Sequence, residues 1–383
     1  MRATDLRIAL FSGNYNYVRD GANQALNRLV GYLLDQGAAV RVYSPTVDEP
    51  AFEPTGDLVD VPNMRMPVKN RGEYRLGLPL DAKARADLET FAPNTIHLSA
   101  PDFTGHSALK WARKRDIPVL ASVHTRFETY LRYYHLGALE PLLTIYQRNL
   151  YRRCDAIVAP SESMADVLRE ERMNDRIGIW SRGVDKERFD PARRDMAWRR
   201  SLGIADETPA IGFVGRLVME KGLDVFAAAV DRLKARGTDF ATIVVGDGPA
   251  RGKFEELLPD AHFVGFQKGD DLGRAVASLD IFLNPSVTET FGNVTLEAMS
   301  SRVPVVAARA TGSASLVVDG VTGRLVEPRD IDGYADALAT YCEDRAVRDA
   351  AGLAGEARSE DYSWDAVNQR IVDLYLELAD RSC

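Results

Sequence analysis

The chain has 383 residues, 45% of them hydrophobic and 27% charged, and a formal net charge of −8. This composition is typical of a globular protein with room for two domains, and the acidic balance argues against a nucleic-acid-binding protein. The three cysteines show no paired spacing, so neither a disulfide framework nor a zinc site is predicted. Because no apolar run reaches 18 residues and the N-terminus lacks a signal-peptide pattern, we expect a cytoplasmic protein.

Short apolar runs alternate with helical patterns in the first half of the chain. Residues 21–37 form an amphipathic helical pattern that ends at Gly37, and Ser161 is placed to cap the helix that follows it. The strands predicted here are 7–13, 39–45, 95–100, 117–124 and 156–160, with a further helix around 104–115.

The alternation weakens at residues 181–208, which are charged and rich in turn residues, and then begins again. Strands that alternate with helices predict parallel sheets covered by helices on both faces. We therefore expect an α/β protein of two doubly wound, Rossmann-like domains, 1–195 and 196–362, followed by a helix at 363–382. The strands predicted in the second half are 209–215, 242–248, 261–266, 280–286 and 303–308, and a helix is predicted at 221–236.

Charge is unevenly distributed along the chain. Residues 1–190 carry a balance of +1 and residues 191–383 a balance of −9. Within the first half, residues 110–153 hold nine basic side chains against three acidic ones. Such a cluster is either a solvated helix surface or a docking surface for anionic lipid or an anionic substrate. The basic residues are Lys110, Arg113, Lys114, Arg115, Arg126, Arg132, Arg148, Arg152 and Arg153.

Two basic residues follow the strand at 209–215. Gly215 opens a turn there, and Arg216 and Lys221 flank the start of the next helix. In open parallel sheets, ligands bind beyond the carboxyl ends of the strands. A guanidinium fork, an ammonium group and the free amides of a helix start would together hold a phosphate group. The alternative is ordinary surface charge, which the position at a strand end disfavours.

Two glutamates follow the penultimate predicted strand. Glu289 lies in a loop and Glu297 in the next helix, and Gly292 between them lets the backbone approach a ligand closely. The amides around Phe291, Gly292 and Asn293 would form a second anion site. A nucleoside diphosphate joined to a sugar has an anionic centre with a hydroxyl-bearing ring on each side, and carboxylates accept hydrogen bonds from hydroxyls. The alternative reading is a helix-capping acid and an unrelated surface glutamate.

His124 ends the strand at 117–124, and Gly21 opens a helix after the first strand. A single histidine is usually structural, but its place before an aromatic, basic segment favours contact with a ligand. One glycine is a weak signal by itself. No G-x-G-x-x-G follows a strand and no G-x-x-x-x-G-K-[ST] occurs, which disfavours a dinucleotide site and a P-loop.

Taken in order along the chain, these motifs resemble the family-four retaining glycosyltransferases. The resemblance rests on the E-x7-E spacing of Glu289 and Glu297, on GRLVMEKG (215–222), SRGVDKERF (181–189) and GDGP (246–249), and on His124. Members of this family have the GT-B architecture, in which two Rossmann-like domains face each other across a cleft. The segments ETFGNVTLEAM and HTRFETYLRYYHLG look most like GDP-mannose-dependent α-mannosyltransferases and glycosyl-diacylglycerol synthases.

The resemblance implies a role for each residue. Arg216 and Lys221 would hold the donor diphosphate and stabilise the departing nucleotide, whereas Glu297 would bind the ribose and Glu289 the transferred sugar. His124 would contact the sugar. The implied donor-binding residues are Gly21, Gly215, Arg216, Lys221, Glu289, Thr290, Phe291, Gly292, Asn293, Val294 and Glu297, and the implied catalytic residues are His124, Arg216, Lys221 and Glu289.

The resemblance also implies that the anomeric configuration is retained, that neither a metal nor another cofactor is needed, and that the final helix returns to the first domain. Two positions depart from the family pattern. Many members have paired glycines where this chain has Asp20-Gly21-Ala22, and many have an acid where Ser315 stands. These departures concern the donor contacts made by the first loop and by that later turn.

We expect the chain to move a hexose from a UDP- or GDP-linked donor to a membrane lipid such as diacylglycerol or a related glycolipid, at the inner membrane face. Domain 1–195 would bind the acceptor and domain 196–362 the nucleotide sugar, with base contacts from 262–269. Residues 110–153 would dock on the membrane, together with their aromatic residues Trp111, Phe127, Tyr130, Tyr133 and Tyr134. The alternatives are a mannosyltransferase of glycan assembly, a sugar-nucleotide epimerase that needs no acceptor, and a binding protein without turnover. No nucleic-acid partner is expected.

Overall fold

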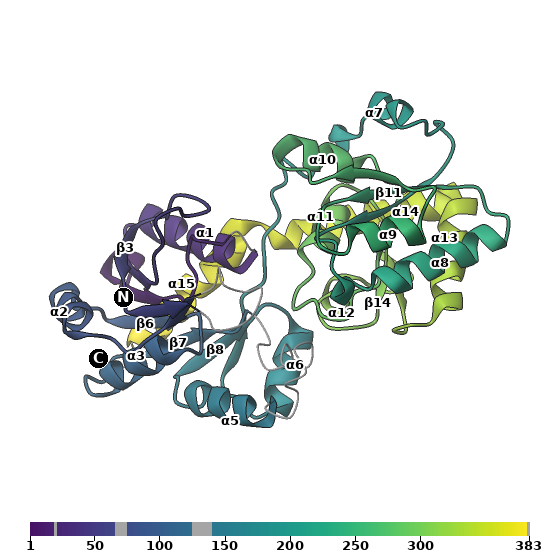
Figure 1. Ribbon diagram of the computed structural model, residues 1–383. Helices are drawn as coiled ribbons and strands as arrows, with labels where there is room; N and C mark the ends of the chain where they lie inside the picture. The colour runs from purple at the N-terminus through teal and green to yellow at the C-terminus, as the bar shows by residue number, and fades with distance from the viewer. Residues whose placement is uncertain (19–20, 66–74, 125–139, 381–383) are drawn as a thin grey trace. The chain divides into compact units, whose positions relative to one another are not determined.

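The computed structural model describes residues 1–18, 21–65, 75–124 and 140–380 (Figure 1). The chain forms two compact units, the first made of Met1–Ser181 and Asp365–Cys383 and the second of Arg182–Trp364. The boundary predicted between residues 195 and 196 is therefore too late. The physical reason is that Val184 and Phe189, which precede the predicted boundary, are buried in a core cluster of the second unit.

A seven-stranded parallel sheet lies at the centre of the first unit, in the order β3-β2-β1-β6-β7-β8-β9. Since β1 pairs with β2 on one side and β6 on the other, the topological switch point lies between β1 and β6. The strands are β1 (Arg7–Phe11), β2 (Ala39–Ser44), β3 (Asp57–Asp60), β6 (Thr95–Leu98), β7 (Val119–Ser122), β8 (Ala156–Ala159) and β9 (Ile177–Ile179); β4 (Asn63–Arg65) and β5 (Arg75–Gly77) form a separate antiparallel pair.

Helices cover both faces of this sheet. Ile96 and Leu98 of β6 pack in the cluster that contains residues of α2 and α3, whereas His97 between them points to the other face and bonds to Tyr375 of α15. Figure 1 shows α15, in yellow at the end of the chain, beside the purple and blue elements of the first unit. The helices are α1 (Gly21–Asp35), α2 (Ala82–Phe91), α3 (Phe103–Arg113), α5 (Glu140–Tyr151), α6 (Glu162–Glu170) and α15 (Trp364–Asp380).

The second unit repeats this plan with a six-stranded parallel sheet in the order β12-β11-β10-β13-β14-β15. This is the strand order of a dinucleotide-binding fold, and its switch point lies between β10 and β13. The strands are β10 (Ala210–Val214), β11 (Ala241–Val245), β12 (His262–Gly265), β13 (Ile281–Asn284), β14 (Val305–Ala308) and β15 (Gly323–Val326).

The alternating side chains of β10 show why both faces are covered. Ile211 and Phe213 pack with Phe226 of α8 on one face, whereas Val214 packs with Leu296 of α11 on the other. The helices of this unit are α7 (Met196–Ser201), α8 (Leu223–Ala235), α9 (Arg251–Leu257), α10 (Gly269–Ala277), α11 (Asn293–Ser300), α12 (Ser313–Leu316), α13 (Ile331–Glu343) and α14 (Arg345–Ser359).

The predicted α/β fold of two doubly wound sheets is confirmed, and every predicted strand is present. Ser161 caps α6 by accepting from the amide of Met164, and Gly37, with φ 81°, follows the end of α1. Within the described ranges, no helix is long and apolar enough to cross a bilayer.

Candidate functional site

The turn after β10 brings two basic side chains to the start of α8. Gly215 has φ 149° and leads through Arg216 to a 3-10 turn that ends at Lys221. Gly222, with φ 74°, precedes α8 and has no side chain to bond the first amides of the helix. These N–H groups have no partner within the helix, so they are available to an anion.

The turn after β13 lies directly against the turn after β10. A Cβ on Gly222 would come within 3.0 Å of the carbonyl oxygen of Pro285. The Thr288 hydroxyl lies 3.3 Å from the carbonyl oxygen of Glu220, to which it donates. Lys221 and Glu289 form an ion pair between the two turns. The predicted phosphate-binding lysine and the predicted sugar-binding glutamate therefore meet at the switch point.

The backbone of the loop that holds Glu289 packs directly against Gly312, a residue that was not predicted from the sequence. Gly312 has φ 87°, and a Cβ there would lie 2.8 Å from the carbonyl oxygen of Glu289 and 2.9 Å from the carbonyl carbon of Phe291. Only glycine fits so close to the backbone in this conformation. Gly312 follows β14, so the rule that chemistry lies just after strands could have found it.

The start of α11 offers unused polar groups. Gly292, with φ 94°, precedes the helix and again provides no side-chain cap. The Oδ1 atom of Asn293 is buried without a hydrogen-bond partner in the described part of the chain. Glu297 lies four residues later, on the same face of the helix, and its carboxyl forms no hydrogen bond with any described residue. A ligand with several hydroxyls would satisfy both side chains.

Burial raises the pKa of Glu297 to about 7. The positive charge of Arg188 opposes this shift and the negative charge of Asp185 adds to it. Both of these residues belong to the segment SRGVDKERF, which the structure places beside α11. At neutral pH the carboxyl is therefore close to its midpoint, and hydrogen bonds from hydroxyl donors would favour the ionised form.

Arg216 is exposed, and its guanidinium forms no ion pair or hydrogen bond with the described residues. The GDGP loop after β11 supports its backbone, because a Cβ on Gly246 would lie 1.9 Å from the carbonyl oxygen of Gly215. Gly246 in turn donates to the carbonyl of Gly265 at 2.8 Å. The next residue, Phe266, is 70% exposed. The carboxyl ends of β10, β11 and β12 thus form one continuous edge.

This edge combines the groups that a nucleoside diphosphate sugar requires. Arg216, Lys221 and two uncapped helix starts can hold a diphosphate, while Glu289 and Glu297 can accept hydrogen bonds from hydroxyls. All the predicted donor-site residues of the second unit lie here: Gly215, Arg216, Lys221, Glu289, Thr290, Phe291, Gly292, Asn293, Val294 and Glu297.

The remaining two predicted residues lie in the first unit, also at the carboxyl edge of its sheet. Gly21 begins α1, after β1, and His124 follows β7. The Nε2 atom of His124 lies 2.8 Å from the hydroxyl oxygen of Ser122. The structure thus divides the predicted residues into two groups, one in each unit.

One residue of the basic stretch 110–153 lies differently from its prediction, and the docking surface itself stays a prediction. Trp111, expected on a docking surface, is buried; its indole donates to Glu89 at 3.2 Å, and the Arg115 guanidinium lies 4.3 Å from the ring centroid. Burial is favoured because the indole packs in the core cluster of the first unit. Arg113 forms an ion pair with Asp155. Six of the predicted docking residues lie outside the described residues: Arg126, Phe127, Tyr130, Arg132, Tyr133 and Tyr134.

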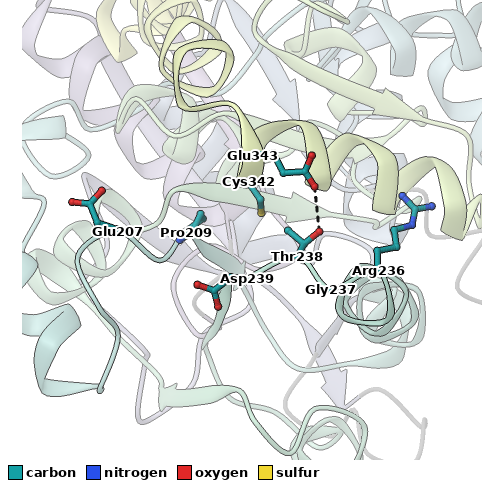
Figure 2. Close-up of a pocket in the computed structure, with 8 residues that line it drawn as sticks. All are labelled: Glu207, Pro209, Arg236, Gly237, Thr238, Asp239, Cys342 and Glu343. Carbon is teal, nitrogen blue, oxygen red and sulfur yellow. Dashed lines mark hydrogen bonds between the residues drawn. The ribbon is translucent and has the colours of Figure 1, made fainter.

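A cavity of about 400 Å³ lies at the other edge of the second sheet, where β10 and β11 begin (Figure 2). In its lining the Thr238 hydroxyl donates to a carboxylate oxygen of Glu343 at 3.4 Å. Burial raises the pKa of the neighbouring Cys342 to about 12, so this thiol is unreactive at neutral pH. The cavity is separate from the candidate site, because it lies where the strands begin, whereas the predicted site residues lie where the strands end.

Comparison with known proteins agrees with this geometry. The model described as "Glycosyltransferase Family 4" matches residues 19–188, and the one described as "Glycosyl transferases group 1" matches residues 208–344. The chain is 30% identical over 377 residues to a GDP-mannose-dependent alpha-mannosyltransferase of Corynebacterium glutamicum, which covers 97% of this chain and 89% of that protein. The chain belongs to the family-four glycosyltransferases. The predicted family is therefore confirmed, and so is an enzyme that transfers sugar from a nucleotide sugar.

A second relative is sulfoquinovosyl transferase SQD2 of Arabidopsis thaliana, 32% identical over 376 residues that cover 95% of this chain and 72% of that protein. Among solved structures, sucrose-phosphate synthase from Thermosynechococcus elongatus has a TM-score of 0.79 at 19% identity, covering 98% of this chain and 99% of the other. Anabaena Alr3699/HepE in complex with UDP has a TM-score of 0.76 at 18% identity, covering 97% and 100%. These likenesses show that the fold is the predicted GT-B fold. The roles of individual residues stay predictions.

Proposed function

We propose that this glycosyltransferase moves a hexose-type sugar from a UDP- or GDP-linked donor to a membrane lipid acceptor, with retention of the anomeric configuration and without a metal ion. The observation that supports the donor half is the Lys221–Glu289 pair between the two uncapped helix starts at the switch point. Diacylglycerol or a related glycolipid is the acceptor class, and the enzyme acts at the inner membrane face.

In this proposal the two cations act on the diphosphate. Arg216 forms paired hydrogen bonds with phosphate oxygens, and Lys221 supplies a point charge, so both stabilise the charge that develops on the departing nucleotide. Glu289 accepts hydrogen bonds from the sugar hydroxyls, while Glu297 and Asn293 bind the ribose. Because Glu289 is already paired with Lys221, it serves as an acceptor and not as a nucleophile. The acceptor hydroxyl attacks the anomeric carbon from the face that the phosphate leaves. Its oxygen bonds to that carbon as the bond to the phosphate oxygen breaks, and its proton passes to the departing diphosphate.

Exposed apolar side chains in the first unit support contact with a bilayer. Phe103 at the start of α3 packs edge-on against Tyr146 of α5, with 6.4 Å between ring centroids. Phe103, Leu142 and Ile145 are 45%, 64% and 57% exposed. Since α3 starts after the carboxyl end of β6 and Phe103 contacts Tyr146 of α5, this group lies near the edge that carries Gly21 and His124. We propose that this apolar group enters the lipid interface.

The basic group at Lys110 to Arg115 lies elsewhere. It falls at the opposite end of α3, which spans Phe103–Arg113 and is therefore about 16 Å long. Arg113 and Arg115 are also neutralised by Asp155 and Glu89. The membrane surface that we propose is thus the apolar group, with the basic end of α3 as a secondary contact for anionic lipid.

A second candidate is mannosyl transfer in glycan assembly. It is favoured by the Corynebacterium glutamicum relative, whose name is GDP-mannose-dependent alpha-mannosyltransferase. In this case GDP-mannose is the donor and a mannosylated glycan is the acceptor. An epimerase on the same fold would convert its donor with no acceptor present.

A transfer assay with labelled donors separates these functions. UDP-glucose or GDP-mannose is supplied with diacylglycerol vesicles or with soluble mannosides, and label is counted in the lipid and aqueous phases. The proposal expects label in the lipid phase, formed in the presence of EDTA and with the anomeric configuration of the donor. Label in mannosides alone would favour the second candidate, and conversion of the donor without acceptor would contradict both.

Vesicle binding tests the membrane surface separately. Leu142→Ser with Ile145→Ser should weaken co-sedimentation with anionic vesicles, because both side chains are more than half exposed. Leu353→Ser, at a leucine of α14 in the second unit that is 51% exposed, is the matched control. Equal binding by all three proteins would exclude the apolar group as the membrane surface.

A further inference from the structure

A buried chain of hydrogen bonds leads from α15 to His124. The hydroxyl of Tyr375 bonds to Nδ1 of His97. Nε2 of His97 lies 2.8 Å from the Ser122 hydroxyl oxygen, and that oxygen lies 2.8 Å from Nε2 of His124. Tyr375 and His97 are 0% exposed and Ser122 is 2% exposed. We name Tyr375, His97 and Ser122 the buried relay.

The first step of the relay has only one possible donor. The hydroxyl of Tyr375 bonds to no described residue other than His97. A buried hydroxyl whose proton finds no acceptor is strongly disfavoured. Burial also raises the pKa of Tyr375, so the phenol keeps its proton. Tyr375 therefore donates to Nδ1 of His97.

The second step follows from the neutral state of His97. Complete burial lowers the pKa of His97 to about 3, so the ring carries a single N–H at neutral pH. Because Nδ1 accepts from Tyr375, that proton is on Nε2, and His97 donates to the Ser122 oxygen. Ser122 has one hydroxyl proton, which it must then donate to Nε2 of His124.

The last step determines the tautomer of His124. Because Nε2 of His124 accepts the hydrogen bond from Ser122, the ring proton of His124 is on Nδ1. We infer that the buried relay fixes His124 in the Nδ1–H tautomer, so that it presents a hydrogen-bond donor from Nδ1 to the transferred sugar. Tyr375, His97 and Ser122 are then positioning residues for this reaction. The inference rests on the proposed function only in its claim that His124 contacts the sugar.

Trp180 holds the two rings of the relay in place. Its ring centroid lies 5.3 Å from that of His124 and 5.9 Å from that of His97, in both cases edge to face. Trp180 is 1% exposed, so it excludes water from the hydrogen bonds between them. Water would otherwise supply alternative donors and acceptors and allow both tautomers of His124.

Nuclear magnetic resonance of the ligand-free protein tests the inference directly. The chain has only five histidines, so a sample labelled with ¹⁵N at histidine gives few signals, which His97→Gln and His124→Gln assign. The ¹⁵N shift of each ring nitrogen shows whether it carries a proton. In the wild type we expect His124 to be protonated at Nδ1 and unprotonated at Nε2. A proton on Nε2 of His124 would overturn the inference.

Tyr375→Phe removes the first donor of the relay and little else. We expect both His97 and His124 to become mixtures of tautomers in this variant. Tyr43→Phe is the matched control, since Tyr43 is equally buried in the same unit and its hydroxyl donates to Asp87 at 2.7 Å, away from the relay. Unchanged tautomers in Tyr375→Phe would also overturn the inference.

Kinetics then tests the positioning role. We expect kcat to fall about tenfold in Tyr375→Phe, the factor that one net hydrogen bond represents, with the donor KM little changed. Because Ser122→Ala interrupts the same relay, the double variant should lose no more than Ser122→Ala alone. A shifted tautomer with an unchanged kcat would refute the positioning role. The predicted tautomer in a protein that transfers no sugar would contradict the proposed function and leave the relay intact.

Discussion

The substitutions Glu289→Gln and Lys221→Met should separate binding of the sugar from binding of the diphosphate. The two side chains form an ion pair in which Lys221 is 31% and Glu289 20% exposed. A pair with this exposure contributes about 0.2–1 kcal/mol to the free energy of unfolding. Both variants should therefore fold, and Glu289→Gln should keep the shape of the loop that Gly312 supports.

The two substitutions should differ in their effect on nucleotide affinity. In Glu289→Gln the lysine is released from its carboxylate partner, so UDP or GDP should bind as tightly as to the wild type or slightly more tightly. The loss of the sugar contact should lower kcat by roughly 10²–10³, as for one donor or acceptor aimed at a developing charge. In Lys221→Met a charge-assisted hydrogen bond of about 1.5–3 kcal/mol is lost, so nucleotide affinity should fall by about one to two orders of magnitude.

Isothermal titration calorimetry with bare UDP and GDP, alongside turnover of the complete donor, measures both effects. The assignment of Glu289 to the sugar is refuted if Glu289→Gln loses nucleotide affinity as severely as Lys221→Met. It is also refuted if Glu289→Gln retains wild-type turnover.

Three further predictions follow from the second unit. The pKa of Glu297 is about 7, above its ordinary value of 4.5, so the folded state holds this proton more tightly than the unfolded state does. The stabilisation that this carboxyl contributes should be complete below about pH 4.5 and lost as the pH rises through 7. Urea unfolding of Glu297→Gln should lack this decline in stability. Gly312→Ala should lower kcat, because its Cβ would lie 2.8 Å from the Glu289 carbonyl oxygen. Gly203→Ala is the control and should leave kcat unchanged, since Gly203 has a similar φ of 81° and open space around it. An equal loss of kcat in both variants would refute the steric argument. Phe266→Ala should weaken UDP or GDP binding about tenfold through lost base stacking and leave pyrophosphate binding unchanged, which competition titration can check.

The fold was largely predictable because hydrophobic periodicity reports strands that are buried on both faces. β10 is buried along its whole length, and its uninterrupted apolar run therefore predicts a buried strand. The short edge strand β9 has three half-buried residues and was missed. The domain boundary was placed too late because the burial of Val184 and Phe189 depends on tertiary contacts that local composition does not report.

The candidate site was predictable where the chemistry directly follows a strand. Arg216, Lys221 and Glu289 were found in this way, since the end of a parallel strand determines where the next side chains lie. The buried relay could not be found, because His97 and Tyr375 are 278 residues apart and meet only when α15 packs on the first sheet. Trp111 was misplaced because a basic neighbourhood in the sequence does not show which side of α3 an indole occupies.

Thermal unfolding in the presence of nucleotides tests the central claim, the donor site at Arg216 and Lys221, most directly. Wild-type protein, Arg216→Ala and Lys221→Met are heated with UDP-glucose, GDP-mannose and the bare nucleotides, with EDTA present. At one hundred times the dissociation constant, binding adds about 2.7 kcal/mol, or roughly 5–10 °C for a unit of this size. The account predicts this shift for one nucleotide family in the wild type and its loss in both variants. Equal shifts in all three proteins, or none in the wild type, would contradict it.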